Sequence, residues 1–344
     1  MRVTALAGGI GGARFLQGLL AYLGVDGANG TDNTNDDVTV IGNTGDDIWV
    51  HGLRVCPDLD TVMYTLGGGI DTDRGWGRQD ETFHAKDELA AYGVEPTWFG
   101  LGDRDIGTHL VRTSSLNAGY PLSAITAALC ERWRPGVTLL PMSDDRAETH
   151  VLVEDPDNPG HETALHFQEW WIKHRARIPA RGFVMVGIEN AKPAPGVIEA
   201  IEAADVIVLP PSNPIVSIGS ILAVPGIREA ITGSTASVVG VSPIISGAPV
   251  RGMADACLQA EGIATTAEAV AAHYGPRAAG GLLDAWLVDT SDAASVTTIT
   301  ASGIACRAVP LFMTDVQASA EMARQAFDLV SEFRGVEASP GSMA

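Results

Sequence analysis

The segment VTALAGGIGGARFLQGLL, Val3–Leu20, joins three local patterns near the start of the chain. An apolar run leads into a glycine cluster, and apolar residues then recur at helical spacing. This order predicts a strand over Val3–Ala7, a tight turn over Gly8–Gly12 and a helix from Ala13. A glycine turn after a first strand lets the backbone approach a diphosphate, which the helix N-terminus then favours. The spacing is not GxGxxG and no P-loop lysine follows, so the turn alone leaves a purely structural role open.

Outward from this segment, the chain alternates predicted strands and helices. A polar stretch over Asp26–Asp37 is typical of a surface loop, and Asp37–Gly42 is the predicted second strand. The alternation predicts an α/β fold with a mostly parallel sheet flanked by helices. The further predicted strands are Val137–Leu140, Thr149–Val153, Phe183–Gly187, Val206–Leu209, Ser237–Val241 and Leu283–Val288. The further predicted helices are Pro121–Arg132, Gly196–Ala204, Met253–Glu261, Ala267–Tyr274 and Val316–Phe333.

Composition sets the class of protein and of ligand. The 344 residues are 46% hydrophobic and 19% charged, which is enough apolar material for a sizeable core. We expect a single domain over residues 1–333, with an inserted lobe near residues 60–130, and a flexible tail over residues 334–344. The net charge of −20 repels phosphate backbones, which argues against nucleic-acid binding. A phosphorylated ligand must therefore be held locally, by backbone amides, a few arginines, or a metal with carboxylates.

Cysteine usage and hydropathy indicate a cytoplasmic protein. The four cysteines lie far apart with no CxxC pair, so a cysteine-based zinc site and a disulfide framework are both disfavoured. No apolar run reaches the roughly 18 residues of a membrane span, and the first residues do not form a signal peptide. We expect no membrane partner. Nucleophile elbows and HExxH motifs are absent as well, so hydrolase triads and zinc enzymes are poorly supported.

Aspartates gather shortly after the second predicted strand. Asp46 and Asp47 follow it in NTGDDIW, and Asp58 and Asp60 stand in PDLDT about ten residues later. Ligands of parallel α/β sheets bind beyond the carboxyl ends of the strands. Carboxylates are the oxygen ligands that suit Mg²⁺, and Mg²⁺ lets an acidic protein hold a diphosphate. Helix capping is the alternative, above all for Asp58, which follows a proline and precedes an apolar run.

Other polar loops also follow predicted strands or lie between elements. They are LGDRD (Leu101–Asp105), PMSDDR (Pro141–Arg146), PPSNPIVSIG (Pro210–Gly219) and SPIISG (Ser242–Gly247). Each of them alone is explained by turn chemistry or, for LGDRD, by a solvated ion-pair network. Together they favour a ligand cleft along one edge of the sheet. The first half of the chain contains a group of tryptophans that is consistent with an aromatic ligand platform or with core packing: Trp76, Trp98, Trp133, Trp170 and Trp171.

In their order along the chain, these motifs resemble those of the 2-phospho-L-lactate transferases of coenzyme F-420 biosynthesis. The resemblance covers nearly the whole chain and is closest to the actinobacterial phosphoenolpyruvyl transferase branch. It rests on GGIGGARFL (Gly8–Leu16), NTGDDIWVHG (Asn43–Gly52), PDLDT (Pro57–Thr61), GLGDRD (Gly100–Asp105), PMSDD (Pro141–Asp145), HFQEWWI (His166–Ile172), PPSNPIVSIG (Pro210–Gly219) and SPIISGAPV (Ser242–Val250).

The resemblance implies a Rossmann-like core with a smaller inserted helical lobe, and a Mg²⁺-dependent group transfer. A guanosine diphosphate carrying phosphoenolpyruvate or phospholactate would react with Fo, the deazaflavin 7,8-didemethyl-8-hydroxy-5-deazariboflavin. The ribityl hydroxyl of Fo attacks the distal phosphorus, GMP leaves, and dehydro-F-420-0 or F-420-0 forms. We also expect a homodimer.

The same resemblance implies roles for individual residues. It places the metal with Asp46, Asp47, Asp58 and Asp60, of which Asp46 and Asp60 are the catalytic candidates. Asp60 and Gly100 would contact Fo, and Asp60 is the candidate base for the ribityl hydroxyl. Arg14 stands where archaeal members carry lysine, which keeps the charge and changes the geometry. The donor would be held by Gly9, Gly11, Gly12, Ser212 and Asn213.

Two other functions compete with this interpretation. A related family of nucleotide-sugar-binding regulatory proteins shares the glycine-turn opening and works by binding alone, so it needs neither the paired aspartates nor an aromatic acceptor pocket. A nicotinamide oxidoreductase is disfavoured because its glycine fingerprint is missing.

Overall fold

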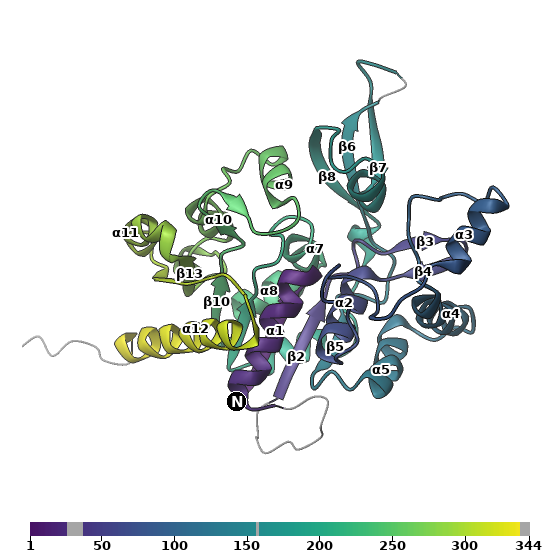
Figure 1. The fold of residues 1–344 in the computed structure, drawn as a ribbon. Coiled ribbons are helices and arrows are strands. Elements are labelled where there is room, and N and C mark those ends of the chain that lie inside the picture. The colour runs from purple at the N-terminus through teal and green to yellow at the C-terminus, as the bar shows by residue number, and fades with distance from the viewer. Residues whose placement is uncertain (26–36, 156–157, 338–344) are drawn as a thin grey trace, which may run out of the picture.

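The computed structural model describes residues 1–25, 37–155 and 158–337, and a seven-stranded sheet lies at the centre of this part of the chain (Figure 1). Every neighbouring pair in the sheet is parallel, in the order β14-β13-β10-β9-β1-β2-β5. The strands are β1 (Arg2–Ala7), β2 (Asp37–Gly42), β5 (Thr138–Pro141), β9 (Val206–Leu209), β10 (Ser237–Val241), β13 (Ala285–Asp289) and β14 (Ala305–Val309). Counted along the chain, this is the doubly wound order 3-2-1-4-5-6 with one further edge strand. The predicted α/β, Rossmann-like fold is confirmed.

Both faces of the sheet are buried, as a parallel sheet requires. In β1, Val3, Ala5 and Ala7 pack into one apolar layer and Leu6 into the other. The first layer is covered by α1 (Gly9–Leu23), α2 (Pro57–Leu66) and α12 (Val316–Glu337). The second is covered by α6 (Val197–Ala203), α7 (Ile218–Ala223), α8 (Ile227–Gly233), α10 (Ala267–Tyr274) and α11 (Val296–Ala301).

Helix α1 begins within the glycine run, at Gly9, and the predicted start at Ala13 was wrong by about one turn. Gly9 has a φ of 64°, a conformation that favours glycine. A Cβ on Gly11 would stand 2.5 Å from the carbonyl oxygen of Pro211. The glycines therefore let the loop after β9 pack directly against the first turn of α1.

A helical lobe lies between β4 and β5, which confirms the predicted inserted lobe (Figure 1). The hairpin of β3 (Ile48–Val50) and β4 (Leu53–Val55) leads into α2, and α2 leads into the lobe. The lobe contains α3 (His84–Ala91), α4 (Asp103–Asn117) and α5 (Leu122–Trp133). The LGDRD motif begins α4, and its interpretation as a solvated ion-pair run missed this helix.

A second insertion is an antiparallel sheet that stands out from the body of the molecule (Figure 1). Its strands are β6 (Glu148–Glu154), β7 (Glu162–His166) and β8 (Ala180–Val186), with a π-helical turn at Glu169–Lys173. The strands predicted at Thr149–Val153 and Phe183–Gly187 exist, but they belong to this sheet. In β6 the residues alternate between buried and less buried, the pattern of a sheet packed on one face.

The remaining elements complete the C-terminal half. They are β11 (Ile244–Ile245), β12 (Ala248–Pro249), α9 (Ala254–Ala260) and the 3₁₀ turns Ile188–Asn190, Arg277–Ala279 and Thr290–Ser295. Helix α12 continues to Glu337, past its predicted end at Phe333, so residues 334–337 of the expected tail are helical. Residues 338–344 and most of the predicted polar loop, residues 26–36, lie outside the described residues. Within the described ranges, no helix is both long and apolar enough to cross a membrane.

Candidate active site

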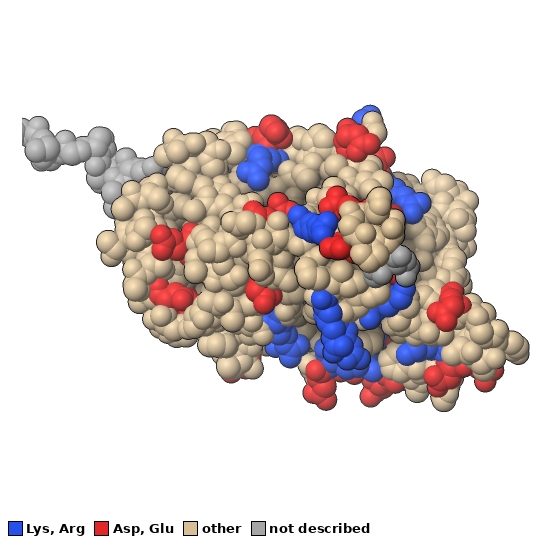
Figure 2. Space-filling view, turned by 90° about the horizontal axis from the view of Figure 1, so that it is seen from above, with Lys and Arg blue, Asp and Glu red and all other residues tan. Residues whose placement is uncertain are grey.

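A cavity of about 330 Å³ opens at the carboxyl edge of the parallel sheet. It lies where the chain turns from β1 to one side of the sheet and from β9 to the other, the place where doubly wound folds bind ligands. Figure 2 looks down on this edge and shows basic side chains close to a hollow in the surface. The wall is built from Gly8–Gly11, Asp46, Pro211–Asn213, Ser242–Pro243, Val250–Ala254 and Leu311–Thr314, with Phe167 and Trp171 from the antiparallel sheet.

Two arginines supply the positive charge of this cavity. Arg14 on α1 is half-buried, Arg251 is exposed, and both line the wall. Within the described residues, neither guanidinium has an ion-pair or hydrogen-bond partner. Burial and the neighbouring charge of Arg251 lower the pKa of Arg14. Two unpaired cations side by side in an acidic protein are suited to an anionic ligand.

The opposite charge is carried by Asp46, with Asp58 close behind the glycine turn. Asp46 lines the cavity at 5% exposure, and its Oδ1 has no hydrogen-bond partner in the described part of the chain. Burial and the charge of Asp58 raise the pKa of Asp46 well above its usual range. Burial also raises the pKa of Asp58 to about 6, against hydrogen bonds from Asn43 and the Gly9 backbone.

Asn43 holds this corner together, and sequence reasoning gave it no role. Its Nδ2 donates to Asp58 Oδ2 at 2.9 Å and to the Val216 carbonyl at 3.2 Å, and its Oδ1 accepts from the Gly45 amide. The side chain is completely buried. One amide thus joins the loop after β2, the start of α2 and the loop after β9. The available signal was its position directly after a buried strand.

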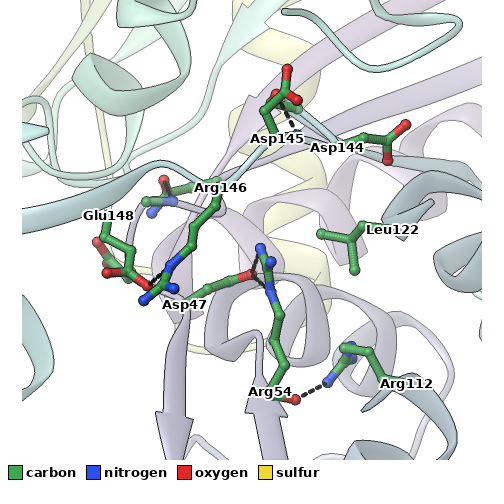
Figure 3. A network of polar contacts seen from close by, with 12 residues as sticks. Asp47, Arg54, Arg112, Leu122, Asp144, Asp145, Arg146 and Glu148 are labelled. Atoms are coloured by element: carbon green, nitrogen blue, oxygen red, sulfur yellow. Dashed lines mark hydrogen bonds and ion pairs between the residues drawn. The ribbon is translucent and has the colours of Figure 1, made fainter. Parts of the chain in front are cut away.

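Asp47 pairs with Arg54 of β4 (Figure 3). Its Oδ2 accepts from Arg54 Nε at 3.1 Å and from Arg54 Nη2 at 2.9 Å. The ion pair engages only Oδ2 of Asp47, and among the described residues its buried Oδ1 has no hydrogen-bond partner.

Asp60 lies in the same buried network, which continues from Arg54 because Arg112 Nη1 donates to the Arg54 carbonyl at 3.4 Å. Its Oδ1 accepts from Arg112 of α4, and His109 Nδ1 lies 3.8 Å from its Oδ2. The other imidazole nitrogen, Nε2, lies 3.5 Å from Asp105, which accepts a 2.5 Å hydrogen bond from Tyr64. Burial opposes ionisation of Asp105, but His109 and Tyr64 outweigh it and lower the pKa of Asp105. Asp58 and Asp60 therefore have opposite electrostatic surroundings although they are two residues apart on α2.

The HFQEWWI motif supports the aspartate loop from behind. His166 Nε2 lies 3.1 Å from the Asp47 carbonyl oxygen, and Gln168 Nε2 donates to the Asp46 carbonyl at 3.2 Å. Trp170 is fully buried, so it belongs to the core, whereas Trp171 is 38% exposed and lines the cavity. The antiparallel sheet thus fixes the backbone on which Asp46 stands.

Comparisons with known proteins identify the family of this chain. The family model "2-phospho-L-lactate transferase CofD" matches residues 3–322. The chain belongs to the 2-phospho-L-lactate transferase family. A "phosphoenolpyruvate transferase" of Streptomyces griseus is 64% identical over 334 residues, covering 97% of this chain and 100% of the relative. One of Mycobacterium avium, with the same name, is 58% identical over 331 residues, covering 94% and 96%.

A solved structure shows the same fold. A Bacillus halodurans protein of the UPF0052 family superposes with a TM-score of 0.63 at 18% identity, covering 95% of this chain and 98% of its own. The predicted family is confirmed, and the chain is a transferase of coenzyme F-420 biosynthesis.

In this transferase, the residues predicted to bind the donor do not all line the cavity. Gly9 and Gly11 line the cavity, whereas Gly12 lies behind it, where a Cβ would stand 2.6 Å from Ser212 Oγ. Ser212 lines the cavity, and its hydroxyl bonds to both the amide and the carbonyl of Gly8. Asn213 also lines the cavity, and its Oδ1 accepts from the Ile215 and Val216 amides. These side chains shape the loops, so ligand contacts from here fall mainly to the backbone.

Gly100 lies outside the cavity wall, in the lobe. A Cβ there would stand 3.9 Å from Lys86 Nζ, 3.9 Å from the Phe83 ring and 4.0 Å from the Trp76 ring. Arg74 lies 5.3 Å from the centroids of both rings. The tryptophan cluster left an aromatic platform open as one alternative for Trp76, whereas Phe83, Arg74 and Lys86 were not predicted, since these residues form no contiguous motif.

Two acidic motifs serve helix starts instead of the cleft. Asp103 of LGDRD accepts from the amides of His84 and Ala85 at the start of α3. Asp144 of PMSDD accepts from the amide and hydroxyl of Ser123 at the start of α5. Turn chemistry therefore explains Asp144, as that loop alone predicts, whereas the ion-pair interpretation of LGDRD did not anticipate the role of Asp103.

The four predicted metal ligands are not gathered around one point. Among the described residues, no group of three or more His, Cys, Asp and Glu side chains could hold a metal ion. Asp47 and Asp60 are paired with arginines, which leaves Asp46 and Asp58. Mg²⁺ commonly takes one or two carboxylates and completes its shell with water and substrate phosphates. The buried, unpartnered Oδ1 of Asp46 fits that arrangement.

Proposed function

We propose that this transferase moves a phosphoenolpyruvyl (or phospholactyl) group from a guanosine-diphosphate-linked donor to Fo. The ribityl hydroxyl oxygen bonds to the distal phosphorus, the bond from that phosphorus to GMP breaks, and dehydro-F-420-0 (or F-420-0) forms. The observation that carries this proposal is one cavity that combines a glycine turn, two unpaired arginines and an unpartnered aspartate. The printed name of the actinobacterial relatives favours the enolpyruvyl donor.

The donor side depends on local charge. Arg14 and Arg251 bind the phosphate oxygens, and the exposed backbone of Gly9 and Gly11 lets the diphosphate approach α1 closely. Asp46 and Asp58 would hold Mg²⁺, which when bound neutralises charge on the diphosphate. Ser212 and Asn213 keep the loop after β9 in place for the guanosine.

The acceptor side depends on Asp60 and the lobe. Arg112 anchors Asp60 through Oδ1, while its Oδ2 is buried and has no hydrogen-bond partner. We assign Oδ2 as the acceptor of the ribityl hydroxyl proton. The aromatic rings near Gly100 would pack against the deazaflavin, and Lys86 lies close enough to contribute charge there.

Product mass tests this proposal. The protein is incubated with Fo, Mg²⁺ and either the enolpyruvyl or the lactyl guanylylated donor, and the products are weighed by mass spectrometry. We expect dehydro-F-420-0 and GMP with the first donor, and loss of product in Asp46→Asn. Asp80→Asn, which removes an exposed carboxylate from the lobe, is the matched control. Nucleotide binding without any product would instead support the regulatory, binding-only function. Mass photometry of the same sample tests the expected homodimer.

A further inference from the structure

We propose that a second pocket, at the C-terminal end of α2, binds a phosphate-type anion. The pocket has a volume of about 280 Å³ and is lined by the Gly67–Gly69 turn, Arg78, Gln79, Arg104, Arg132 and Trp133. It is separate from the donor cavity, because Asp58 stands at the start of α2 and Gly67 follows its end. A helix of 10 residues is about 15 Å long, so the two sites are at opposite ends of this element.

The charge of the pocket is unbalanced. Of the residues that the structure describes, three arginines line it and no carboxylate does. Among the described residues, their one ion pair joins Arg104 to Asp80 at 3.9 Å, between side chains that are 50% and 81% exposed. Such a pair contributes little in water. Within the same ranges, Arg78 and Arg132 form no ion pair at all.

The negative ends of nearby helices offset only part of this positive charge. Helices α2 and α5 both end at the pocket, and each C-terminus is equivalent to about half a negative charge. The last carbonyls of α2 already accept from the amides of Gly67, Gly69 and Ile70, which weakens their field further. About one negative charge therefore faces three guanidinium groups, and roughly two positive charges stay unmatched.

The guanidinium groups also have donors to spare. Arg78 and Arg132 lie 5.0 and 5.4 Å from the centroid of Trp133, and stacking on an indole holds an arginine without using its N–H groups. Within the described ranges, the Arg78 side chain donates once, to the Arg104 carbonyl, and its buried Nε has no partner. Several convergent N–H donors with two excess positive charges match the oxygens of a phosphate better than a single carboxylate.

The test measures binding of inorganic pyrophosphate and of glycerol phosphate by titration calorimetry without Mg²⁺. The background is Arg14→Gln/Arg251→Gln, which removes the cations of the donor cavity. We expect binding to persist in this background and to weaken roughly tenfold in Arg132→Gln, the loss of a hydrogen bond to a charged group. Arg134→Gln removes an exposed charge two residues away and is the matched control. The tighter of the two probes shows whether a free phosphate ion or a phosphate ester is preferred.

Arg132 is exposed on α5, so its variant should fold, and Arg78→Gln gives an independent second test. The proposal is overturned if both variants bind pyrophosphate as tightly as their background, or if the background binds neither probe. Because the donor cavity is disabled throughout, failure here leaves the transferase function standing. Conversely, a transferase assay that yields no product would not affect the proposal of anion binding in this pocket.

Discussion

At the residue scale, Asp60 resembles Asp47 in pairing with a buried arginine. Arg112 is 1% exposed and is held by Asp60 through Oδ1, with His109 beside them. The motif alone suggests that removing the charge of Asp60 should affect turnover and leave stability unchanged. The structure changes this expectation, because a buried arginine would lose its counter-charge.

We therefore predict that Asp60→Asn lowers both kcat and stability. The free energy of unfolding should fall by about 3 to 5 kcal/mol, since one charge of a buried pair is left uncompensated. Loss of the proton acceptor should lower kcat by roughly 10²- to 10⁴-fold. Urea unfolding of Asp60→Asn, Arg112→Met and the double variant measures the interaction free energy between the two side chains. A double variant no more stable than Asp60→Asn would show that the two side chains do not act as a pair.

Asp58 should behave in the opposite way. Burial raises its pKa from 3.8 to about 6, so the folded state disfavours the ionised carboxylate. Such a shift costs roughly 3 kcal/mol of stability at neutral pH. The cost is absent below pH 3.8, grows as the pH rises to about 6, and is constant above that. Asp58→Asn should therefore be more stable than the parent at pH 7.5, by about 1 to 3 kcal/mol after some loss of hydrogen bonding.

Urea unfolding over a pH series measures the difference in stability between Asp58→Asn and the parent, and this difference should disappear near pH 4. Excess Mg²⁺ should stabilise the parent more than Asp58→Asn, because the ion gains one fewer carboxylate in the variant. The exposed variant Asp80→Asn is the control for both experiments. A stability difference that stays the same at all pH values would contradict the claim that the raised pKa of Asp58 destabilises the folded state.

At the scale of elements, the first turn of α1 depends on glycine for packing. A Cβ on Gly11 would meet the Pro211 carbonyl at 2.5 Å, and backbone cannot swing aside as a flexible side chain can. Gly11→Ala should therefore lower the melting temperature and weaken donor binding together. Gly107→Ala is the matched control, since that glycine lies in α4 and a Cβ there would have nothing within 4 Å. It should be more stable than the parent by up to about 1 kcal/mol. Weakened donor binding in Gly11→Ala at an unchanged melting temperature would point to phosphate contact instead.

The same elements show what the sequence could and could not predict. β1, the glycine run and α1 were predictable because strand, turn and helix signals there are all local. The separate antiparallel sheet of β6–β8 was not predicted, because a strand with alternating buried and exposed residues has the same sequence pattern whichever sheet it joins. The Asp60–Arg112 contact joins positions 52 residues apart and has no sequence signal. Asp46 was found because it lies in the loop that follows a buried strand, whereas the contacts of Asp47 and Asp60 depend on arginines that only the fold brings near.

At the scale of the whole molecule, the net charge of −20 opposes the approach of an anionic donor. This repulsion acts over long distances through water and is screened beyond about 10 Å at 0.1 M salt. Attraction by Arg14 and Arg251 acts only within the cavity, where salt screens it less. The association rate and the dissociation rate of the donor should therefore respond differently to salt.

We predict that the association rate of a fluorescent GDP analogue rises a few-fold between about 20 and about 200 mM NaCl at constant Mg²⁺, because screening removes the long-range repulsion. Stopped-flow fluorescence measures the rate. Arg14→Gln/Arg251→Gln should associate more slowly at every salt concentration and show a steeper rise, since it keeps the repulsion and loses the local attraction. Its dissociation rate should increase at the same time. If the parent rate instead falls as salt is added, the two arginines govern the encounter itself, and the acidic surface is too distant from the cavity to matter.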